Sequence, residues 1–194
     1  MKTFILKAAL TLAMIISFLG CSSDDSSCPE LTCQNGGVFK DCGCNCTQGY
    51  AGANCETQIT PSKIKVTNIR VKLFPNYNGA NDWDFGSGPD IFVRLGAGNG
   101  DENTVVLYSS GYAQDAISNG FNYYDFTPSS PIEINSPLSK HVIALFDYDS
   151  TSLNEVMAAF TFNIYEPTNH FSDKLILRDA SVPIEFELSL QYQW

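Results

Sequence analysis

Five acidic side chains lie in two stretches of the sequence whose spacing suits cation binding. Five residues separate Asp84 from Asp90 in the first stretch; in the second, one residue separates Asp147 from Asp149, and five separate Asp149 from Glu155. Carboxylates brought close together repel one another, which raises their pKa values or opens the loops unless a cation is bound. Calcium is the natural cation, because it takes six to eight oxygens at about 2.3–2.6 Å and tolerates irregular loops. We therefore expect a Ca²⁺ site if both stretches fold to the same end of the protein.

Each acid alone is also typical of a turn, because aspartate forms local hydrogen bonds with the backbone. The matching spacings, each beside an apolar stretch, favour a shared cation over that alternative. Trp83, Phe85 and Leu153 flank the acids. We expect these three side chains to form a membrane- or ligand-contacting tip, with packing inside the loops as the alternative.

Short β-strands must position these acids. From residue 63 onward, about eight apolar or alternating stretches are separated by turn residues, and none keeps the spacing of a helix. They are residues 63–74, 90–97, 103–112, 130–134, 140–147, 156–165, 174–179 and 184–194. The pattern predicts an all-β, antiparallel sandwich.

Alternation along the strands refines this prediction. Successive side chains point to opposite faces, so Asp147 and Asp149 project from one face where the stretch 141–146 leaves the core. The last stretch alternates strictly, which predicts a buried face and a wet face carrying Glu185 and Glu187.

Together with PDIFVRL, NYYDFTPSSPIEI and IALFDYD, the acid spacings make residues 63–194 resemble a C2 domain, a β-sandwich that binds calcium and phospholipid. The resemblance implies an eight-stranded C2-like sandwich whose calcium shell is completed by ligand oxygens. It assigns Asp84 and Asp90 to the family's first calcium loop, and Asp147, Asp149 and Glu155 to its third. Glu155 stands where the family usually has an aspartate.

Six cysteines fall between Cys28 and Cys55, a segment too small to bury a useful core. In a secreted protein such a segment is stabilised by disulfides, and six cysteines allow fifteen connectivities. A zinc site on C-G-C-N-C is the alternative; an oxidising location and the lack of a nearby histidine disfavour it.

The turn Asn35-Gly36-Gly37, the C-x-C spacing and the glycines before Cys55 make residues 28–56 resemble an EGF-like module. The resemblance implies three disulfides, and residues 57–62 then form a linker. The implied pairs are Cys28 with Cys42, Cys33 with Cys44, and Cys46 with Cys55.

The first twenty residues predict export. MKTFILK carries two lysines and precedes an apolar run too short to span a bilayer comfortably. The following FLGC resembles the lipobox of bacterial lipoproteins, which implies a signal peptide over residues 1–20 and lipidation of Cys21. Residues 21–27 are then an acidic polar leader, and we expect a lipid-anchored protein exposed on the outer membrane. An ordinary cleaved signal or a single anchor helix is the alternative.

The composition indicates a folded, acidic protein: 44% of residues are hydrophobic and 16% are charged. Without the predicted signal, nine lysines and arginines face twenty-one acids, which disfavours nucleic acid as a partner. The basic residues Lys63, Lys65, Arg70 and Lys72 follow a single strand and suit its solvent face.

These observations favour a non-enzymatic, calcium-dependent binding module held at a membrane by its N-terminal lipid. Its ligand is expected to be anionic: a phospholipid, lipopolysaccharide phosphates or a surface protein. The alternative is a glycan-binding lipoprotein in which calcium is structural and the sugar lies on Trp83, Tyr123, Tyr124 or Tyr148. Hydrolysis by the carboxylates is disfavoured, since acidic turns make a better cage than a positioned acid–base pair. His141 and His170 belong to no recognised catalytic arrangement.

Overall fold

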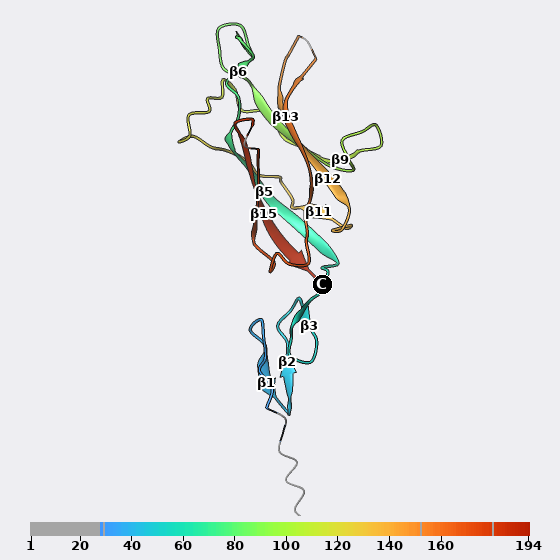
Figure 1. Ribbon diagram of the computed structural model, residues 1–194. Coiled ribbons are helices and arrows are strands. Elements are labelled where there is room, and N and C mark those ends of the chain that lie inside the picture. Colours follow the sequence, from blue (N-terminus) through green and yellow to red (C-terminus); the bar gives the residue numbers. More distant parts are fainter. Residues whose placement is uncertain (1–27, 29, 152, 180) are drawn as a thin grey trace, which may run out of the picture.

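The computed structural model describes residues 28, 30–151, 153–179 and 181–194, and its regular elements in these ranges are β-strands (Figure 1). No helix in the described ranges has the length and apolarity needed to cross a bilayer. The predicted signal peptide, Cys21 and the acidic leader lie outside the described residues. The all-β class expected from the sequence is confirmed.

Two antiparallel sheets form the part of the protein that follows residue 62. The first has the order β10-β5-β15-β14, with β11 also paired to β5. Its strands are β5 (Lys63–Leu73), β10 (Tyr124–Phe126), β11 (Ile132–Ile134), β14 (Lys174–Asp179) and β15 (Ile184–Gln193). The second has the order β13-β12-β8-β9. Its strands are β8 (Ile91–Ala97), β9 (Val105–Ser109), β12 (Lys140–Asp147) and β13 (Glu155–Asn163).

The hydrophobic core lies between the two sheets. Alternate residues of each central strand point inward, because successive side chains of a β-strand face opposite ways. Fully buried core residues include Ile64, Val66, Ile69, Val71, Val93, Leu95, Ile143, Leu145, Phe186 and Leu188. The other residues of these strands reach the outer faces of the sandwich.

Strands β10 and β11 share one edge of β5. β10 pairs with residues 69–71 of β5, and β11 pairs with residues 64–66. Pro128 and Pro131 lie near the break between them and have no N–H to donate to a ladder. The sequence predicted the second of these strands but missed the first, so the expected eight strands become nine in the two sheets.

The outer face of β15 differs from the prediction. Glu185 and Glu187 do lie on that face, but they are only 7% and 6% exposed. Lys72 of β5 pairs with both glutamates, Lys174 of β14 pairs with Glu187, and Arg178 of β14 pairs with Glu185, at 2.5–3.5 Å. The face expected to be wet is therefore covered by cations from the two flanking strands.

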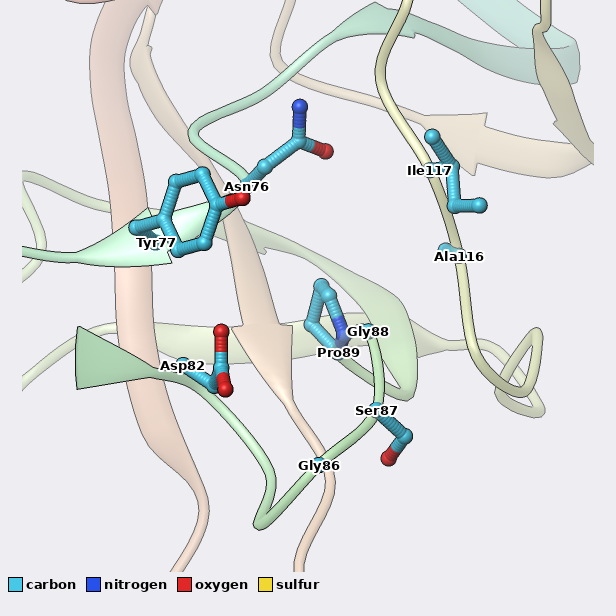
Figure 2. Close-up of a pocket in the computed structure, with 9 residues that line it drawn as sticks. All are labelled: Asn76, Tyr77, Asp82, Gly86, Ser87, Gly88, Pro89, Ala116 and Ile117. Carbon is cyan, nitrogen blue, oxygen red and sulfur yellow. The ribbon is translucent and has the colours of Figure 1, made fainter.

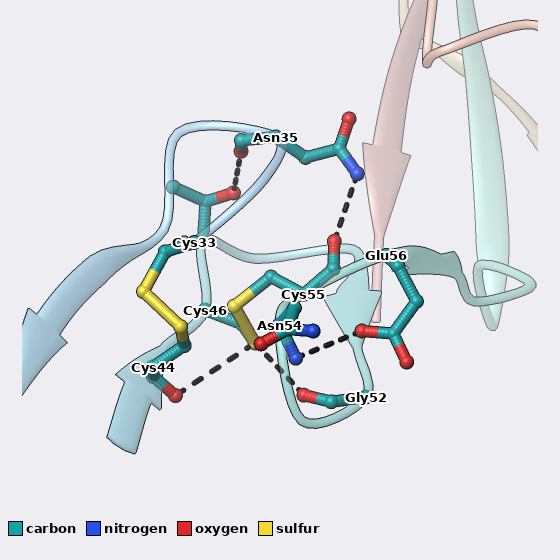
Figure 3. The surroundings of a disulfide bond; sticks show 9 residues. Cys33, Asn35, Cys44, Cys46, Gly52, Asn54, Cys55 and Glu56 are labelled. Carbon is teal, nitrogen blue, oxygen red and sulfur yellow. Dashed lines mark hydrogen bonds between the residues drawn. A yellow bond between two sulfur atoms is a disulfide. The ribbon is translucent and has the colours of Figure 1, made fainter. Parts of the chain in front are cut away.

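Residue 28 and residues 30–58 form a small disulfide-rich module. It contains two short hairpins, β1 (Val38–Lys40) with β2 (Gly43–Asn45) and β3 (Tyr50–Ala51) with β4 (Thr57–Gln58). Its disulfides join Cys28 to Cys42, Cys33 to Cys44, and Cys46 to Cys55. These are the pairs implied by the sequence resemblance. Figure 3 shows how Asn35 adds to them, donating a hydrogen bond of 2.8 Å to the carbonyl of Cys55.

Aromatic side chains join this module to the sandwich. The ring of Phe171 packs edge-on against Tyr50 of the module and against Trp194 at the chain end, with centroids 5.4 and 4.9 Å apart. Gly49 permits this approach, because a Cβ at that position would lie 2.5 Å from the Phe171 ring. Its φ of +91° also suits glycine alone.

Gln58 reinforces the junction through hydrogen bonds. Its side-chain amide donates to the Tyr165 hydroxyl and to Asn169 Oδ1, both at 3.2 Å, and its carbonyl oxygen accepts from the His170 amide at 3.0 Å. The segment 57–62, expected to be a linker, thus begins with a paired strand whose last residue is bound to the sandwich.

The end of β12 and the start of β13, at Asp147 and Glu155, lie at the other end of the sandwich from the module (Figure 1). Lys63 pairs with Gln193 next to the junction, whereas Ile91 pairs with Asp147 at the far end. A small hairpin of β6 (Tyr77–Asn78) and β7 (Asn81–Asp82) also rises from the far end. We call this end the acidic pole; it comprises the described residues of segments 76–90, 111–123 and 147–155.

Candidate metal centre

Strand pairing brings the two acid stretches together at the acidic pole. Asp147 ends β12, opposite Ile91 on one side and Glu155 on the other. Asp90 immediately precedes β8, and its amide donates a 2.7 Å hydrogen bond to Asp147 Oδ1. Its carbonyl accepts from the Tyr148 amide at 2.8 Å. The loops before β8 and after β12 are therefore joined at their bases.

Three carboxylates from the second stretch lie within reach of a single ion. Asp147, Asp149 and Glu155 each offer an oxygen, and these atoms lie within 4.8 Å of one another. Ligands around one calcium ion lie about 2.3–2.6 Å from it, so opposite ligand atoms are separated by roughly twice that distance. The Asn154 side chain supports the arrangement by accepting a hydrogen bond from the Asp149 amide at 3.1 Å.

Asp147 is the most constrained of these acids. The residue is fully buried, and its Oδ2 atom has no hydrogen-bond partner among the described residues. Burial raises the pKa of Asp147 to about 6; the hydrogen bond from the Asp90 amide opposes the rise, and repulsion by three nearby aspartates adds to it. Those aspartates are Asp84, Asp149 and Asp90. A buried carboxylate oxygen without a donor is the feature that a bound cation satisfies.

The first acid stretch lies near this cluster, although Asp84 and Asp90 are not among the acids whose oxygens lie within 4.8 Å of one another. Burial raises the pKa of Asp84, and repulsion by neighbouring carboxylates raises it further. Those neighbours are Asp90, Asp149 and Asp115. Among the ion pairs of the described residues, none involves Asp84, Asp90, Asp147, Asp149 or Glu155. All five predicted ligand acids thus gather at one pole, where no lysine or arginine of the described chain neutralises them.

Asp115 was missed by the sequence reasoning. It lies in the segment between β9 and β10, adopts a left-handed φ of +49°, and donates its amide to Asp90 Oδ1 at 2.9 Å. Its carboxylate is close enough to Asp84 to raise the pKa of that residue. No signal in the sequence distinguishes Asp115 from other turn acids such as Asp101.

The apolar residues beside the acids take different positions. Phe85 and Leu153 project into solvent, at 108% and 90% exposure. Phe121, which the sequence reasoning missed, is also exposed, in the segment that leads to β10. Trp83 does not join this tip: it packs against the core, and its indole nitrogen donates to the Pro75 carbonyl at 2.9 Å.

A pocket of about 330 Å³ is lined in part by the loop that runs from Asp84 to Asp90 (Figure 2). Residues 86–89 form part of its lining, with Ala116 and Ile117 on one side of them and the Asp82 carboxylate and the Tyr77 ring on the other. The walls are close because Gly88 has no side chain: a Cβ there would lie 2.5 Å from the Ala116 carbonyl oxygen. The pocket places open space directly beside the loop that joins Asp84 to Asp90.

The two histidines lie away from the acids. His141 is the second residue of β12, six residues before Asp147, and is buried in the sheet between Ala97 and Phe162. Burial lowers its pKa. His170 is part of the junction with the disulfide-rich module.

The aromatic residues proposed as a sugar platform do not form one coplanar surface. Tyr123 lies under the guanidinium of Arg70, 4.0 Å from the ring centroid, and Tyr124 packs edge-on against Phe74. Tyr148 alone has a coplanar partner, Tyr112, with centroids 4.5 Å apart and planes 7° apart.

Similarity to known proteins is found among solved structures. No family model matches the chain, and no curated protein sequence is similar to it. Among solved structures, a C2 domain is similar at 12% identity and a TM-score of 0.44, over 66% of this chain and 97% of that one. A C2 domain of plant extended synaptotagmin 1 is similar at 14% identity and a TM-score of 0.38, over 70% of this chain and 97% of that one.

A human cytosolic phospholipase A2 is similar at 15% identity and a TM-score of 0.43, over 69% of this chain. The similar region is 18% of that enzyme. The TM-scores of these three similarities are all below 0.5, and nothing about family, ligand or activity follows from them.

Proposed function

We propose that this protein is a non-enzymatic binding module that uses calcium at its acidic pole to hold an anionic ligand. One observation supports this above all: a fully buried carboxylate, Asp147, has an oxygen without a partner in the described chain and lies among other carboxylates. A buried charge is costly unless it is paired, and a cation at this position pairs several carboxylates at once.

Calcium fits the donors better than the alternatives. The candidate ligands are carboxylate oxygens from two irregular loops, without a thiol or histidine among them. Magnesium demands near-ideal octahedral geometry, whereas calcium accepts irregular shells of six to eight oxygens. Asp147, Asp149 and Glu155 would hold the ion, with Asp84 and Asp90 closing the shell from the other loop.

The bound ion would convert the acidic pole into a surface for anions. Calcium held by loops retains positions for outside oxygens, and phosphate or carboxylate groups are suitable donors. The exposed side chains Phe85 and Leu153 flank these positions and suit the apolar boundary of a membrane. A phospholipid or the phosphates of lipopolysaccharide are the ligands that use both features.

The N-terminal part would hold this surface away from an outer membrane. Lipidation at Cys21 would supply the anchor, residues 21–27 a short polar tether, and the EGF-like module a spacer. The docking of Gly49 and Gln58 on the sandwich supports the spacer role, because it fixes the module at the end opposite the acids.

Calorimetry with calcium tests the metal site. The full-length protein in detergent, freed of metal by chelation, is titrated with CaCl₂. We expect saturable binding with a dissociation constant on the order of 10⁻⁴–10⁻³ M, as in extracellular calcium modules. Asp147→Asn combined with Asp149→Asn should abolish it. The matched control is Glu102→Gln, an exposed acid in the turn between β8 and β9. Wild-type heats in the double variant would contradict the proposal.

Vesicle binding tests the ligand. Vesicles of phosphatidylcholine with phosphatidylglycerol are mixed with the protein lacking residues 1–21, so that the proposed lipid anchor is absent, in calcium or in chelator, and are then sedimented. We expect binding only with calcium, and weaker binding after Phe85→Ser with Leu153→Ser, since each exposed apolar side chain contributes to membrane affinity. Equal sedimentation in chelator would rule out the calcium-dependent mode.

A further inference from the structure

A second pocket lies on the outer face of the four-stranded sheet, outside the metal centre. It has a volume of about 190 Å³. Its walls come from β8, from the end of β9 and from the segments that follow β9 and β12. Tyr148 belongs to this pocket although it lies between Asp147 and Asp149 in sequence, because alternation turns its side chain to the opposite face.

The floor of the pocket is an aromatic array. Phe92 of β8 and Phe146 of β12 are directly paired across the sheet and stack, with centroids 5.0 Å apart. Tyr148 packs edge-on against Phe92, and Tyr112 stacks flat on Tyr148. Tyr112 is 51% exposed, so much of its ring remains open to a ligand. The array offers a flat apolar surface with phenol hydroxyls at its edge.

Arg94 lies over this array without a carboxylate partner. Its guanidinium carbon is 4.9 Å from the centroid of Phe146 and 5.2 Å from that of Phe92. The chain has three arginines, and the other two, Arg70 and Arg178, form ion pairs at 2.8 and 2.7 Å. Within the described ranges, no acid lies within ion-pair distance of Arg94. The planar guanidinium of Arg94, held against aromatic rings, is therefore available to bind an anionic group from outside the protein.

Neutral polar groups complete the pocket. Ser109 and Asn154 lie at its wall. Asn154 accepts the Asp149 amide through Oδ1, and its amide hydrogens have no acceptor among the described residues. Ser110, by contrast, is already engaged with Val93 and Gly111. The free groups are donors and hydroxyls that suit a ligand rich in hydroxyl groups.

We propose that this pocket binds a single sugar ring that carries a carboxylate, such as a uronic acid residue of an acidic polysaccharide. The ring's C–H face lies on Tyr112, its carboxylate pairs with Arg94, and its hydroxyls contact Asn154 and Ser109. The volume fits one ring, since pockets for drug-sized ligands are larger, at about 300–1,000 Å³. This function goes beyond calcium-dependent binding and uses no acid of the metal centre.

Nuclear magnetic resonance of the arginine side chains tests the proposal directly. The ¹⁵N-labelled full-length protein in detergent, with excess chelator, shows one Nε–H signal for each of its three arginines. Sodium glucuronate is added, with glucose and acetate as comparisons that lack the carboxylate or the ring. We expect glucuronate to shift the Arg94 signal saturably and to bind about tenfold more tightly than either comparison, the effect of one charge-assisted pair. The signals of Arg70 and Arg178 should stay in place.

Variants assign each contribution. Arg94→Gln should reduce glucuronate affinity to that of glucose, and Tyr112→Ala should weaken binding of both sugars, measured by saturation-transfer difference spectra. Arg178→Gln is the matched control and should bind as the wild type does.

Three outcomes would overturn the proposal: no saturable shift at the highest soluble glucuronate concentration, an equal response to acetate, or unchanged affinity in Arg94→Gln. Binding that appears only with calcium and disappears in Asp149→Asn would assign glucuronate to the metal centre instead.

Discussion

Two groups of buried acids lie at different places in the sandwich. One group is paired with cationic side chains, and the other is not. On the outer face of β15, Glu185 and Glu187 are covered by Lys72, Lys174 and Arg178. At the acidic pole, Asp147 is buried more completely and has no cationic partner in the described chain. One group is paired with cations of the protein, and the other is the group at which we propose that calcium binds. Burial of acids therefore indicates a binding site only where the partner is missing.

The pKa values express the same contrast. Hydrogen bonds from Lys174 and Lys72 lower the pKa of Glu187 to about 2. Burial raises the pKa of Asp147 to about 6. As the pH falls from about 4.5 to 2, the folded protein loses the stability contributed by Glu187. As the pH rises from 3.8 to about 6 without calcium, Asp147 becomes charged and stability decreases.

Breaking the compensated group should have the largest effect. Lys72→Met removes the one cation that pairs with both glutamates, and we expect a loss of about 3 kcal/mol in the free energy of unfolding, because it leaves buried charge underpaired. Urea denaturation at pH 7 measures this loss. Lys140→Met, which replaces an exposed lysine of β12, is the control. A loss below about 1 kcal/mol would mean that Lys174 and Arg178 suffice.

Supplying the missing partner should stabilise the acidic pole by nearly as much. With free calcium at a hundredfold excess over its dissociation constant, linkage predicts about 2.7 kcal/mol of added stability. Thermal unfolding with calcium and with chelator measures it as a rise in Tm. The rise should be absent in Asp147→Asn and retained in Glu102→Gln. A melting temperature unaffected by chelation would remove the distinction between the two groups.

Neutralising the uncompensated acid should stabilise the metal-free protein. Asp147→Asn keeps Oδ1 as an acceptor for the Asp90 amide but removes the buried charge, and we expect a gain of about 2 kcal/mol at pH 7.5 in chelator. The gain should shrink towards pH 4, where the wild-type carboxyl is protonated when folded. Asp125→Asn should behave oppositely and lose stability, because its charge is paired with Arg70. A destabilised Asp147→Asn in chelator would contradict this explanation.

The smallest effect is expected at the edge of the cluster. The Asp115 carboxylate adds negative charge near Asp84. It is not one of the three carboxylates, those of Asp147, Asp149 and Glu155, whose oxygens lie within 4.8 Å of one another. Asp115→Asn should therefore weaken calcium binding about two- to threefold, which corresponds to roughly 0.5 kcal/mol, because it only reduces the negative potential at the site. Calcium titration at low and high salt measures this, since high salt should diminish the difference. A tenfold loss that persists in high salt would make Asp115 a direct ligand.

The sequence was sufficient for features that depend on neighbours along the chain. The strands and the core face follow from alternation, and the placement of Asp147 follows from its position directly after an apolar stretch. Features that depend on contacts with other strands could not be predicted from the sequence. The ion pairs of Glu187 require knowing that β5 and β14 flank β15. Asp115 comes from a long irregular segment whose path no periodicity reveals. Tyr112 was placed at the end of the predicted strand 103–112, but β9 ends at Ser109, so Tyr112 lies in the same irregular segment. Trp83 packs inward and its indole nitrogen donates a hydrogen bond to the Pro75 carbonyl, a contact that the spacing of residues does not predict.

The contact of Gly49 with Phe171 and Trp194 also bears on geometry at a larger scale. The packed rings at the junction join the module to one end of the sandwich, which leaves the acidic pole at the end remote from the module. If the proposed anchor holds the N-terminal end, this arrangement favours a ligand on a facing surface, and the protein would then act as a bridge between two bodies.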